Sequence, residues 1–473
     1  MLVYIVFMLR QKLAYRSYNT SSGRILAFYN LAKNSFSLLE DDAAPVVEMI
    51  LNGKNCEEIV SHFVRERGES IAEELISFVD FWENDLKSQN LSHDTSRQPF
   101  TLPPWGKGES AEDLFYHRCA DENILAVLNC EITYACSQRC VHCYNPHHNP
   151  EAAMSTEMWI NIIDQAANLG VLRLVLTGGE CTCHPGFWEI LEHARSCNMA
   201  VTVQSNGLYF NSEEKMARLA ALFPRSYEVS IYGATAETHE KITTIPGSWN
   251  KTLKSLEYAK RFNIPIAIKS PITTLNWQEA GQIADRAREL GAGHQMDLCI
   301  TSQNDGGRNP LKWRIQDKEV LKTIIRNEKL PLYHGMEKLA RQKVIKRPLD
   351  GPLCGAGSNS LCISPTGNVT LCGGLMHSAG DVRYQSLEEI WNGNPRKAFL
   401  LTRLRDKVEC AECELNGYCS MCPALSLNEK GNMFVKNEFD CLCAEARKDV
   451  MDSMKISNAS FPIGEALNIN NQK

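Results

Sequence analysis

The sequence lacks the marks of several protein classes. It has no long apolar run, no internal repeat and no excess of basic residues. The apolar start, Met1 to Leu9, is far shorter than the roughly 20 residues that span a bilayer, and no small-residue cleavage site follows it. The net charge of −6 argues against a nucleic-acid partner, because nucleic-acid-binding surfaces are basic. We therefore expect a cytoplasmic protein without a transmembrane segment.

What the sequence has in excess is cysteine. The chain has 473 residues, 44% of them apolar and 22% charged, which is typical of a globular protein of two or three domains. Nineteen cysteines in so long a chain, with no recognisable secretion signal, argue against a disulfide framework. Most of them fall in two groups, at residues 130–143 and 354–443. Clustered thiolates of this kind indicate metal or iron–sulfur sites.

The apolar pattern predicts two kinds of structure. Short alternating runs between residues 14 and 40 predict a small antiparallel sheet, and helical patterns follow near 41–52, 55–67 and 70–86. From about residue 119, strand-like and helical runs alternate, which predicts an α/β fold with a parallel sheet, curled or doubly wound. The strand-like runs lie near residues 124–133, 172–177, 199–205, 226–231, 264–270 and 295–301. Ligand sites in such sheets lie at the carboxyl ends of the strands, where the first cysteine group falls.

Three cysteines, Cys136, Cys140 and Cys143, follow the first strand of this sheet. Three thiolates on one loop can hold three irons of a 4Fe–4S cluster and leave the fourth iron open to a small molecule. The alternative is a zinc ion, which takes four ligands. His142 would then be the fourth, but it sits between two cysteines and reaches back poorly to the same metal.

The spacing Cys136-x3-Cys140-x2-Cys143 resembles the signature of the radical S-adenosylmethionine superfamily. The resemblance implies a partial (β/α)6 TIM-like barrel and a cluster whose open iron binds S-adenosylmethionine. It also implies a reductant, such as flavodoxin or ferredoxin, and a 5′-deoxyadenosyl radical that abstracts a hydrogen atom. The family usually has an aromatic residue before the third cysteine; here His142 stands there, and its ring can still contact the adenine.

Polar residues after the later strands resemble the S-adenosylmethionine contacts of the same family. They are Gly178, Gly179 and Glu180 after the second strand, Ser205 and Asn206 after the third, and Ser230 at the fourth. Taken singly, each is more often a turn or cap residue. The family usually continues the first of these motifs with proline, whereas this chain has Cys181. A functional thiol at Cys181 or Cys183 is a minor alternative to a structural one.

The second cysteine group resembles the SPASM extension, which carries one or two auxiliary 4Fe–4S clusters. The resemblance assigns Cys354, Cys372 and Cys422 to one cluster, with Cys362 as candidate fourth ligand, and Cys410, Cys413 and Cys419 to the other, with Cys441 or, preferably, Cys443 as the last ligand. The spacing before Cys422 is two residues, where the family usually has three. A pair of zinc sites in residues 410–422 is the alternative.

The N-terminal module resembles the winged-helix recognition element of enzymes that modify ribosomally made peptides. Such a module can bind the leader of a precursor peptide as an added strand; the alternative is a merely stabilising domain. The resemblances divide the chain into a recognition module (1–92), a linker (93–118), a radical domain (119–320), a helical bridge (321–350), a SPASM domain (351–455) and a tail (456–473).

Together these features predict a peptide maturase that joins a cysteine sulfur to a carbon atom as a thioether. Carbon–carbon or carbon–oxygen cross-linking, epimerisation and sulfatase maturation are alternatives on the same scaffold, and a zinc-stabilised peptide-binding protein is the alternative outside enzymes. No general base stands out. His184, His294 and Asp297 lie near strand ends, but each is better explained as structural.

Overall fold

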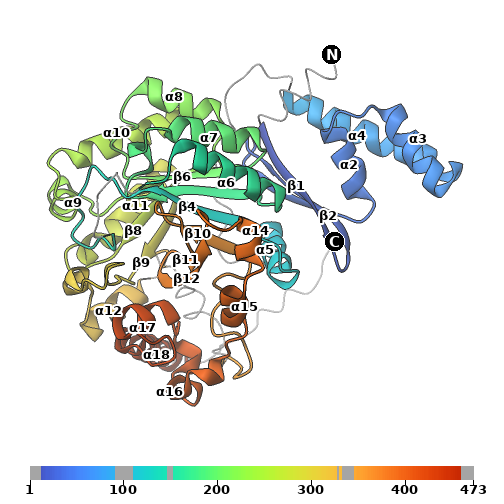
Figure 1. The fold of residues 1–473 in the computed structure, drawn as a ribbon. Helices are drawn as coiled ribbons and strands as arrows, with labels where there is room; N and C mark the ends of the chain where they lie inside the picture. The colour runs from blue at the N-terminus through green and yellow to red at the C-terminus, as the bar shows by residue number, and fades with distance from the viewer. Residues whose placement is uncertain (1–11, 91–109, 146–152, 328–329, 333–345, 460–473) are drawn as a thin grey trace, which may run out of the picture.

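The computed structural model describes residues 12–90, 110–145, 153–327, 330–332 and 346–459. Most of the predicted tail and linker, half of the predicted bridge and the apolar start lie outside these ranges. Figure 1 shows a small N-terminal module beside a larger α/β body. No helix in the described part of the chain is both long enough and apolar enough to cross a membrane.

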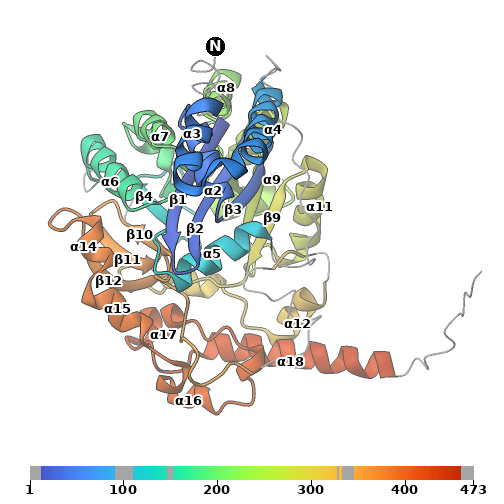
Figure 2. The same ribbon diagram turned by 90° about the vertical axis from the view of Figure 1, so that its right-hand side faces the viewer.

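The N-terminal module is an antiparallel sheet followed by three helices, as the sequence predicts. Its elements are β1 (Leu13–Thr20), β2 (Gly23–Asn30), β3 (Ser35–Glu40), α2 (Ala43–Leu51), α3 (Cys56–Arg67) and α4 (Ala72–Asn90). Both faces of the sheet are apolar. Leu26 and Phe28 pack against the module's own helices, whereas Ile25, Ala27 and Tyr29 pack toward the body. Figure 2 shows α2, α3 and α4 on the outer side of this sheet.

The last eight residues of the predicted linker (111–118) belong to a helix, so the prediction of an exposed connection is wrong there. The helix is α5 (Ala111–Asp121), and Ser110 caps its first turn in a reciprocal pair with Asp113. Phe115 and Cys119 are fully buried between the module's sheet and the body. This helix therefore belongs to the joint between the two parts.

The body is built on six parallel strands with helices around them, as predicted. The strands are β4 (Val127–Thr133), β5 (Arg173–Gly178), β6 (Ala200–Ser205), β7 (Ser226–Ser230), β8 (Ile266–Pro271) and β9 (Gly293–Asp297). The helices are α6 (Thr156–Asn168), α7 (Phe187–Ser196), α8 (Glu213–Ala221), α9 (Ala236–Thr243), α10 (Ser248–Arg261) and α11 (Ala280–Leu290). The strands run in sequence order, so their carboxyl ends share one edge.

The C-terminal region extends this same sheet, which the predicted division at residue 351 does not foresee. Its strands are β10 (Ser360–Ile363), β11 (Asn368–Cys372) and β12 (Leu375–Asp381), and β10 pairs in parallel with β4. The helices of this region are α12 (Lys318–Arg326), α14 (Leu387–Trp391), α15 (Asn394–Leu400), α16 (Val408–Ala411), α17 (Pro423–Lys430) and α18 (Glu438–Ala459). The pairing places the second cysteine group beside the first strand of the barrel.

The two faces of the joined strands differ in polarity. Cys130, Ile132 and Ile363 lie in the apolar core, and their neighbours along the strands point to the opposite face. The strand register determines which side chains are neighbours on this opposite face: Cys362 is paired with Asn129 of β4 on one side and with Thr370 of β11 on the other. Glu131 lies two residues beyond Asn129 and therefore points to the same face of the sheet as Asn129, away from the apolar core.

A partly buried ionic contact docks the N-terminal module on the body. The Arg225 guanidinium donates to both carboxylate oxygens of Glu112, at 2.6 and 2.9 Å, and the Tyr29 hydroxyl donates to the same carboxylate at 2.5 Å. Glu112 belongs to α5 and Tyr29 to β2, so three segments meet at one carboxylate. Removing this charge would leave Arg225 without its counter-ion in a largely buried position.

We therefore expect Glu112→Gln to loosen the joint. The loss should be about 2 kcal/mol, or roughly thirtyfold faster hydrogen exchange in β2 and α5. The matched control is Glu48→Gln, because Glu48 pairs with Arg24 at the module's more exposed surface, where such a pair contributes less than about 1 kcal/mol. Equal effects of the two variants would contradict the assigned role of Glu112.

Candidate functional site

The first three cysteines lie together on the loop after β4. Burial raises the pKa of Cys136 to about 11, with the nearby Glu180 carboxylate and Cys143 thiol acting in the same direction and a hydrogen bond from the Gln138 amide acting against them. The pKa of Cys140 is also raised, first by burial and then by the Cys143 and Cys136 thiols. Bringing three thiols together in a buried loop is unfavourable for their thiolates unless positive charge joins them. The donor set therefore fits an iron–sulfur cluster with three protein ligands.

The glycines after β5 are required by this loop's backbone. A Cβ atom on Gly178 would lie 2.3 Å from the Thr133 carbonyl oxygen, and one on Gly179 would lie 2.5 Å from the Tyr134 carbonyl oxygen. The Gly179 amide donates to the Thr133 carbonyl at 2.8 Å, so the two loops are in direct contact. The glycines thus serve the packing of one loop on the other.

Glu180 organises the polar residues after the next strand. Its buried carboxylate accepts hydrogen bonds from the Asn206 amide at 2.7 Å, the Ser205 hydroxyl at 3.0 Å and the Thr182 hydroxyl at 2.7 Å. The Asn206 side chain in turn donates to the Ser137 hydroxyl at 3.1 Å. Glu180, Ser205 and Asn206 are therefore brought together beside the cysteine loop. In this arrangement the Glu180 carboxylate already has hydrogen-bond donors within the protein.

His142 and Ser230 also lie near the first cysteine loop. The His142 ring lies 4.8 Å from the Tyr232 ring, and Ser230 lies within hydrogen-bonding reach of the Tyr232 hydroxyl. Burial lowers the pKa of His142 to about 4, so its imidazole is neutral. Among the described residues, the buried Nδ1 of His142 and Nε2 of Gln138 have no hydrogen-bond partner. Unpartnered polar atoms beside the three thiols fit a polar ligand such as S-adenosylmethionine.

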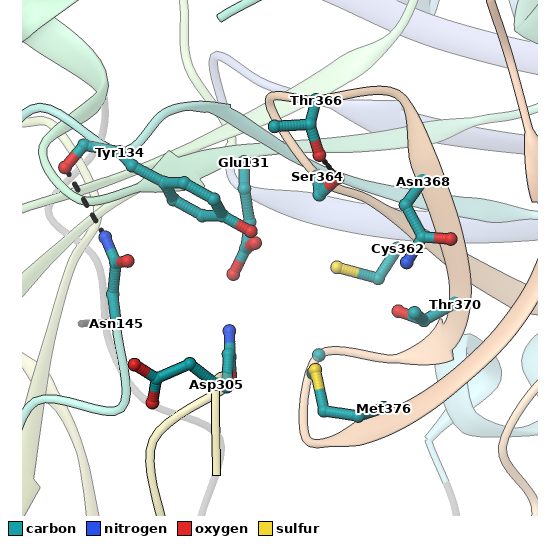
Figure 3. Close-up of a pocket in the computed structure, with 12 residues that line it drawn as sticks. Glu131, Tyr134, Asn145, Asp305, Cys362, Ser364, Thr366, Asn368, Thr370 and Met376 are labelled. Carbon is teal, nitrogen blue, oxygen red and sulfur yellow. Dashed lines mark hydrogen bonds between the residues drawn. The ribbon is translucent and has the colours of Figure 1, made fainter. Parts of the chain in front are cut away.

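A polar pocket of about 290 Å³ lies between the two cysteine groups (Figure 3). It is lined by Glu131, Tyr134, Asn145, Asn304, Asp305, Cys362, Ser364, Thr366, Asn368, Thr370, Gly373 and Met376. Its walls come from β4, the cysteine loop, the loop after β9 and the β10–β12 hairpins. A pocket between the two cysteine groups, at the carboxyl edge of the strands, is where a substrate would be expected.

Glu131 is the functional candidate that the sequence did not reveal. It is 5% exposed and projects into the pocket, and its carboxylate accepts a hydrogen bond from Tyr144 at 2.7 Å. Burial raises its pKa, while its hydrogen bonds with Tyr144 and Tyr134 act in the opposite direction. The available signal was a lone carboxylate within a strand, between the apolar residues Cys130 and Ile132.

Cys354, Cys372 and Cys422 approach one another, as the resemblance implies. Burial raises the pKa of Cys354 and of Cys422; the nearby Cys372 thiol adds to this effect at Cys354, and the Cys354 thiol adds to it at Cys422. Cys362 is buried on the pocket side of this group and also lies near the Cys372 thiol. It can therefore serve either as the fourth ligand or as a wall of the pocket.

The other auxiliary group contains Cys441, whereas the sequence favoured Cys443. Burial raises the pKa of Cys410, and among its neighbours the Cys441 and Cys413 thiols act in the same direction; Cys419 also has Cys441 as a neighbour. Cys443, two residues further along α18, is 4% exposed and packs in the main apolar core. Two residues along a helix correspond to about 200° of rotation, so both thiols cannot face the same cluster.

The zinc alternative meets a geometric difficulty. Ligands of a single ion must converge, and within the described ranges only Asp164, His193 and Cys197 form a group of three whose ligand atoms all lie within 4.8 Å of one another. The thiols of residues 410–422 do not converge in this way. Each thiolate of a 4Fe–4S cluster binds a different iron, so wider spacing suits a cluster.

The remaining candidates have local partners. The ring of His184 lies between the Met154 carbonyl and the Gly186 amide, and His294 contacts the Ser270 hydroxyl. The Asp297 carboxylate accepts from the Cys299 amide, and the Cys181 thiol donates to the Gln204 carbonyl. These contacts support structural roles. Cys183 lies beside the first cysteine loop and is exposed, and we assign it no structural role.

Two family models match this chain. Residues 130–287 match the radical SAM superfamily, and residues 354–423 match an iron–sulfur cluster-binding domain named SPASM. An AdoMet-dependent heme synthase of Methanosarcina barkeri is 27% identical over 345 residues, which cover 67% of this chain and 96% of that protein. A mycofactocin maturase of Mycobacterium ulcerans is 28% identical over 308 residues, which cover 62% of this chain and 81% of that protein.

A solved structure resembles nearly the whole chain. It is Streptococcus suis SuiB bound to precursor peptide SuiA, with a TM-score of 0.59 and 15% identity. The match covers 92% of this chain and 98% of the other. At this identity the likeness concerns the fold alone.

Gly179→Ala should disrupt the loop contact. The added methyl group overlaps the Tyr134 and Ala135 carbonyl oxygens, so we expect cleavage of S-adenosylmethionine to fall by at least about tenfold, or ~1.4 kcal/mol. Production of 5′-deoxyadenosine by the anaerobically purified protein measures this. Gly281→Ala in α11 is the control, because its nearest contact would be 3.9 Å away. Undiminished cleavage by the Gly179 variant would contradict the packing argument.

Cys441→Ala and Cys443→Ala separate the two assignments for the last ligand. We expect the first variant to lose one 4Fe–4S cluster, or about four irons per chain, and the second to keep it. Iron and sulfide analysis, with electron paramagnetic resonance of the reduced proteins, gives the answer. If Cys443→Ala lost the cluster and Cys441→Ala kept it, Cys443 would be the last ligand.

Proposed function

We propose that this chain, a radical S-adenosylmethionine enzyme with a SPASM iron–sulfur domain, installs thioether cross-links in a ribosomally made precursor peptide. The observation that carries the proposal is the N-terminal module. In its sheet, β3 pairs with β2 alone among the described strands. A free strand edge is a ready site for an extended peptide, which adds by backbone hydrogen bonds.

The surface near this edge also suits a peptide leader. β3 is only partly buried along its length, and α4 exposes the large apolar side chains Ile76 and Phe81. Backbone pairing would supply affinity, and exposed apolar side chains of this kind would supply contacts for the leader's own side chains. The leader then docks on the module while the following core peptide enters the pocket of the body.

The comparisons support a peptide more than a haem precursor as substrate. The alignment with the heme synthase takes up nearly all of that protein, yet about a third of this chain has no counterpart in it. The likeness to SuiB, a structure that holds a precursor peptide, extends over 92% of the chain. A peptide substrate would account for this additional part of the chain.

The site residues fit three tasks in this reaction. When bound, S-adenosylmethionine and the clusters supply the radical that removes a hydrogen atom from carbon, and an acceptor for the electron left over when the carbon–sulfur bond forms. His142 and Tyr232 would hold the adenine, and the Glu180 network would fix the shape of the cofactor site. Glu131 lies in the pocket, where it can accept the proton that leaves the peptide thiol. A cytoplasmic setting with a reductant such as flavodoxin or ferredoxin completes the proposal.

The test is the mass and thiol count of the precursor peptide after turnover. The anaerobic holoenzyme is incubated with reductant, S-adenosylmethionine and the cysteine-containing short open reading frame product encoded nearest its gene. A thioether requires a loss of two mass units together with one free thiol. Loss of two units with all thiols retained would instead indicate carbon–carbon or carbon–oxygen cross-linking, and unchanged mass with inverted residues would indicate epimerisation.

Glu131→Gln should separate radical formation from product formation. We expect 5′-deoxyadenosine to form at close to the normal rate, while peptide modification falls by about a hundredfold because the amide cannot accept the proton. Tyr144→Phe is the matched control. It removes one hydrogen bond to the carboxylate but keeps the carboxylate, and should slow modification less than about tenfold. Loss of 5′-deoxyadenosine formation in the Glu131 variant would show a structural role instead.

A further inference from the structure

Three potential metal ligands meet on the outer side of the barrel, on helices rather than on the cysteine loops. They are Asp164 of α6, His193 of α7 and Cys197 at the end of α7. Figure 1 shows α6 and α7 side by side, next to the N-terminal strand β1. This group takes no part in the functional site described above.

Local structure aims two of these side chains in one direction. His193 and Cys197 are four residues apart, so they lie on the same face of α7. The backbone at Cys197 is fixed from outside the helix, because the Arg16 guanidinium of β1 donates to its carbonyl oxygen at 2.6 Å. Asp164 reaches the pair from the neighbouring helix.

The three ligand atoms converge on one point. The Asp164 Oδ1 atom lies 2.7 Å from the His193 Nε2 atom, and the Cys197 Sγ atom lies 3.7 Å from the same nitrogen. The Cys197 Sγ atom lies 3.8 Å from the Asp164 Oδ1 atom. A nucleophilic triad would place its thiol and its carboxylate on opposite nitrogens of the imidazole. Approach of both groups to one nitrogen is instead the arrangement of ligands around an ion.

The distances suit zinc. With bonds of about 2.0 to 2.3 Å and tetrahedral angles, ligand atoms lie roughly 3.3 to 3.6 Å apart. The two distances to sulfur are already close to this range, and the distance between Nε2 and Oδ1 must lengthen by well under 1 Å. Asp164 can provide this movement, because its side chain is 53% exposed. Imidazole, thiolate and carboxylate together are also a donor set that zinc accepts.

We propose that Asp164, His193 and Cys197 form a Zn²⁺ site, with water as the fourth ligand. The metal links α6 to α7 beside the Arg16 contact and so stiffens the side of the barrel on which the N-terminal module docks. The site is independent of the radical chemistry and of the identity of the peptide.

The test uses the anaerobic holoenzyme with its clusters in place and Zn²⁺ as the probe. Zinc is added at one equivalent per chain, free metal is removed by gel filtration, and the zinc that remains is measured by elemental analysis and X-ray absorption at the zinc edge. We expect one retained zinc with a single sulfur neighbour. Cys197→Ser and Asp164→Asn should each weaken binding at least about tenfold, measured by competition with a chelator, with cluster iron unchanged.

His62→Gln is the matched control. His62 lies near a carboxylate of Glu66 on α3, at 3.7 Å, but is not part of the group of three ligands, and its loss should not alter zinc binding. Three results would overturn the proposal: no retained zinc, a zinc with four sulfur neighbours, as expected if the cluster cysteines hold it, or Cys197 and Asp164 variants that bind zinc as tightly as the unsubstituted protein. Iron content checks that each variant is folded.

Discussion

The parallel pairing of β10 with β4 is the contact on which the rest of the structure depends. It joins a strand at residue 360 to a strand at residue 127, and so makes the C-terminal region a continuation of the barrel sheet. Through this pairing the pocket has one wall on β4 and another on the β10–β12 hairpins. Without it, the two cysteine groups would lie on separate units, and Glu131 and Cys362 would not face the same space.

The structure repeatedly buries thiols next to other thiols, where their thiolate forms are unfavourable. Thiols are buried beside thiols in three places, and burial raises the pKa in each of them. The Glu180 carboxylate is buried as well, but hydrogen bonds from Ser205 and Asn206 compensate for its loss of contact with water. Beside the first cysteine loop the protein thus satisfies the Glu180 carboxylate internally and leaves the thiols of Cys136, Cys140 and Cys143 for metal. Buried sulfur ligands and a cluster that holds them are therefore parts of one stable unit.

The sequence was most informative where structure is local. The spacing of Cys136, Cys140 and Cys143 and the strand–helix alternation identified the barrel and the first ligand set, because both depend on nearby residues. The helix from Ala111 was missed because the polar, proline-containing stretch before it masked the capping pair of Ser110 and Asp113. The choice between Cys441 and Cys443 depends on which side of α18 faces the other thiols. Glu131 could be recognised only after the register of β4 against β10 was known, since that pairing creates the pocket.

The most direct test of the central claim follows a hydrogen atom from the peptide to the cofactor. The precursor peptide is prepared with deuterium on its carbon-bound positions, one residue type at a time, and 5′-deoxyadenosine is analysed by mass spectrometry after turnover by the anaerobic holoenzyme. The account predicts deuterium in 5′-deoxyadenosine for one residue type, with the same residue altered in the peptide. Formation of 5′-deoxyadenosine without deuterium from any labelled peptide would contradict a peptide substrate in this pocket.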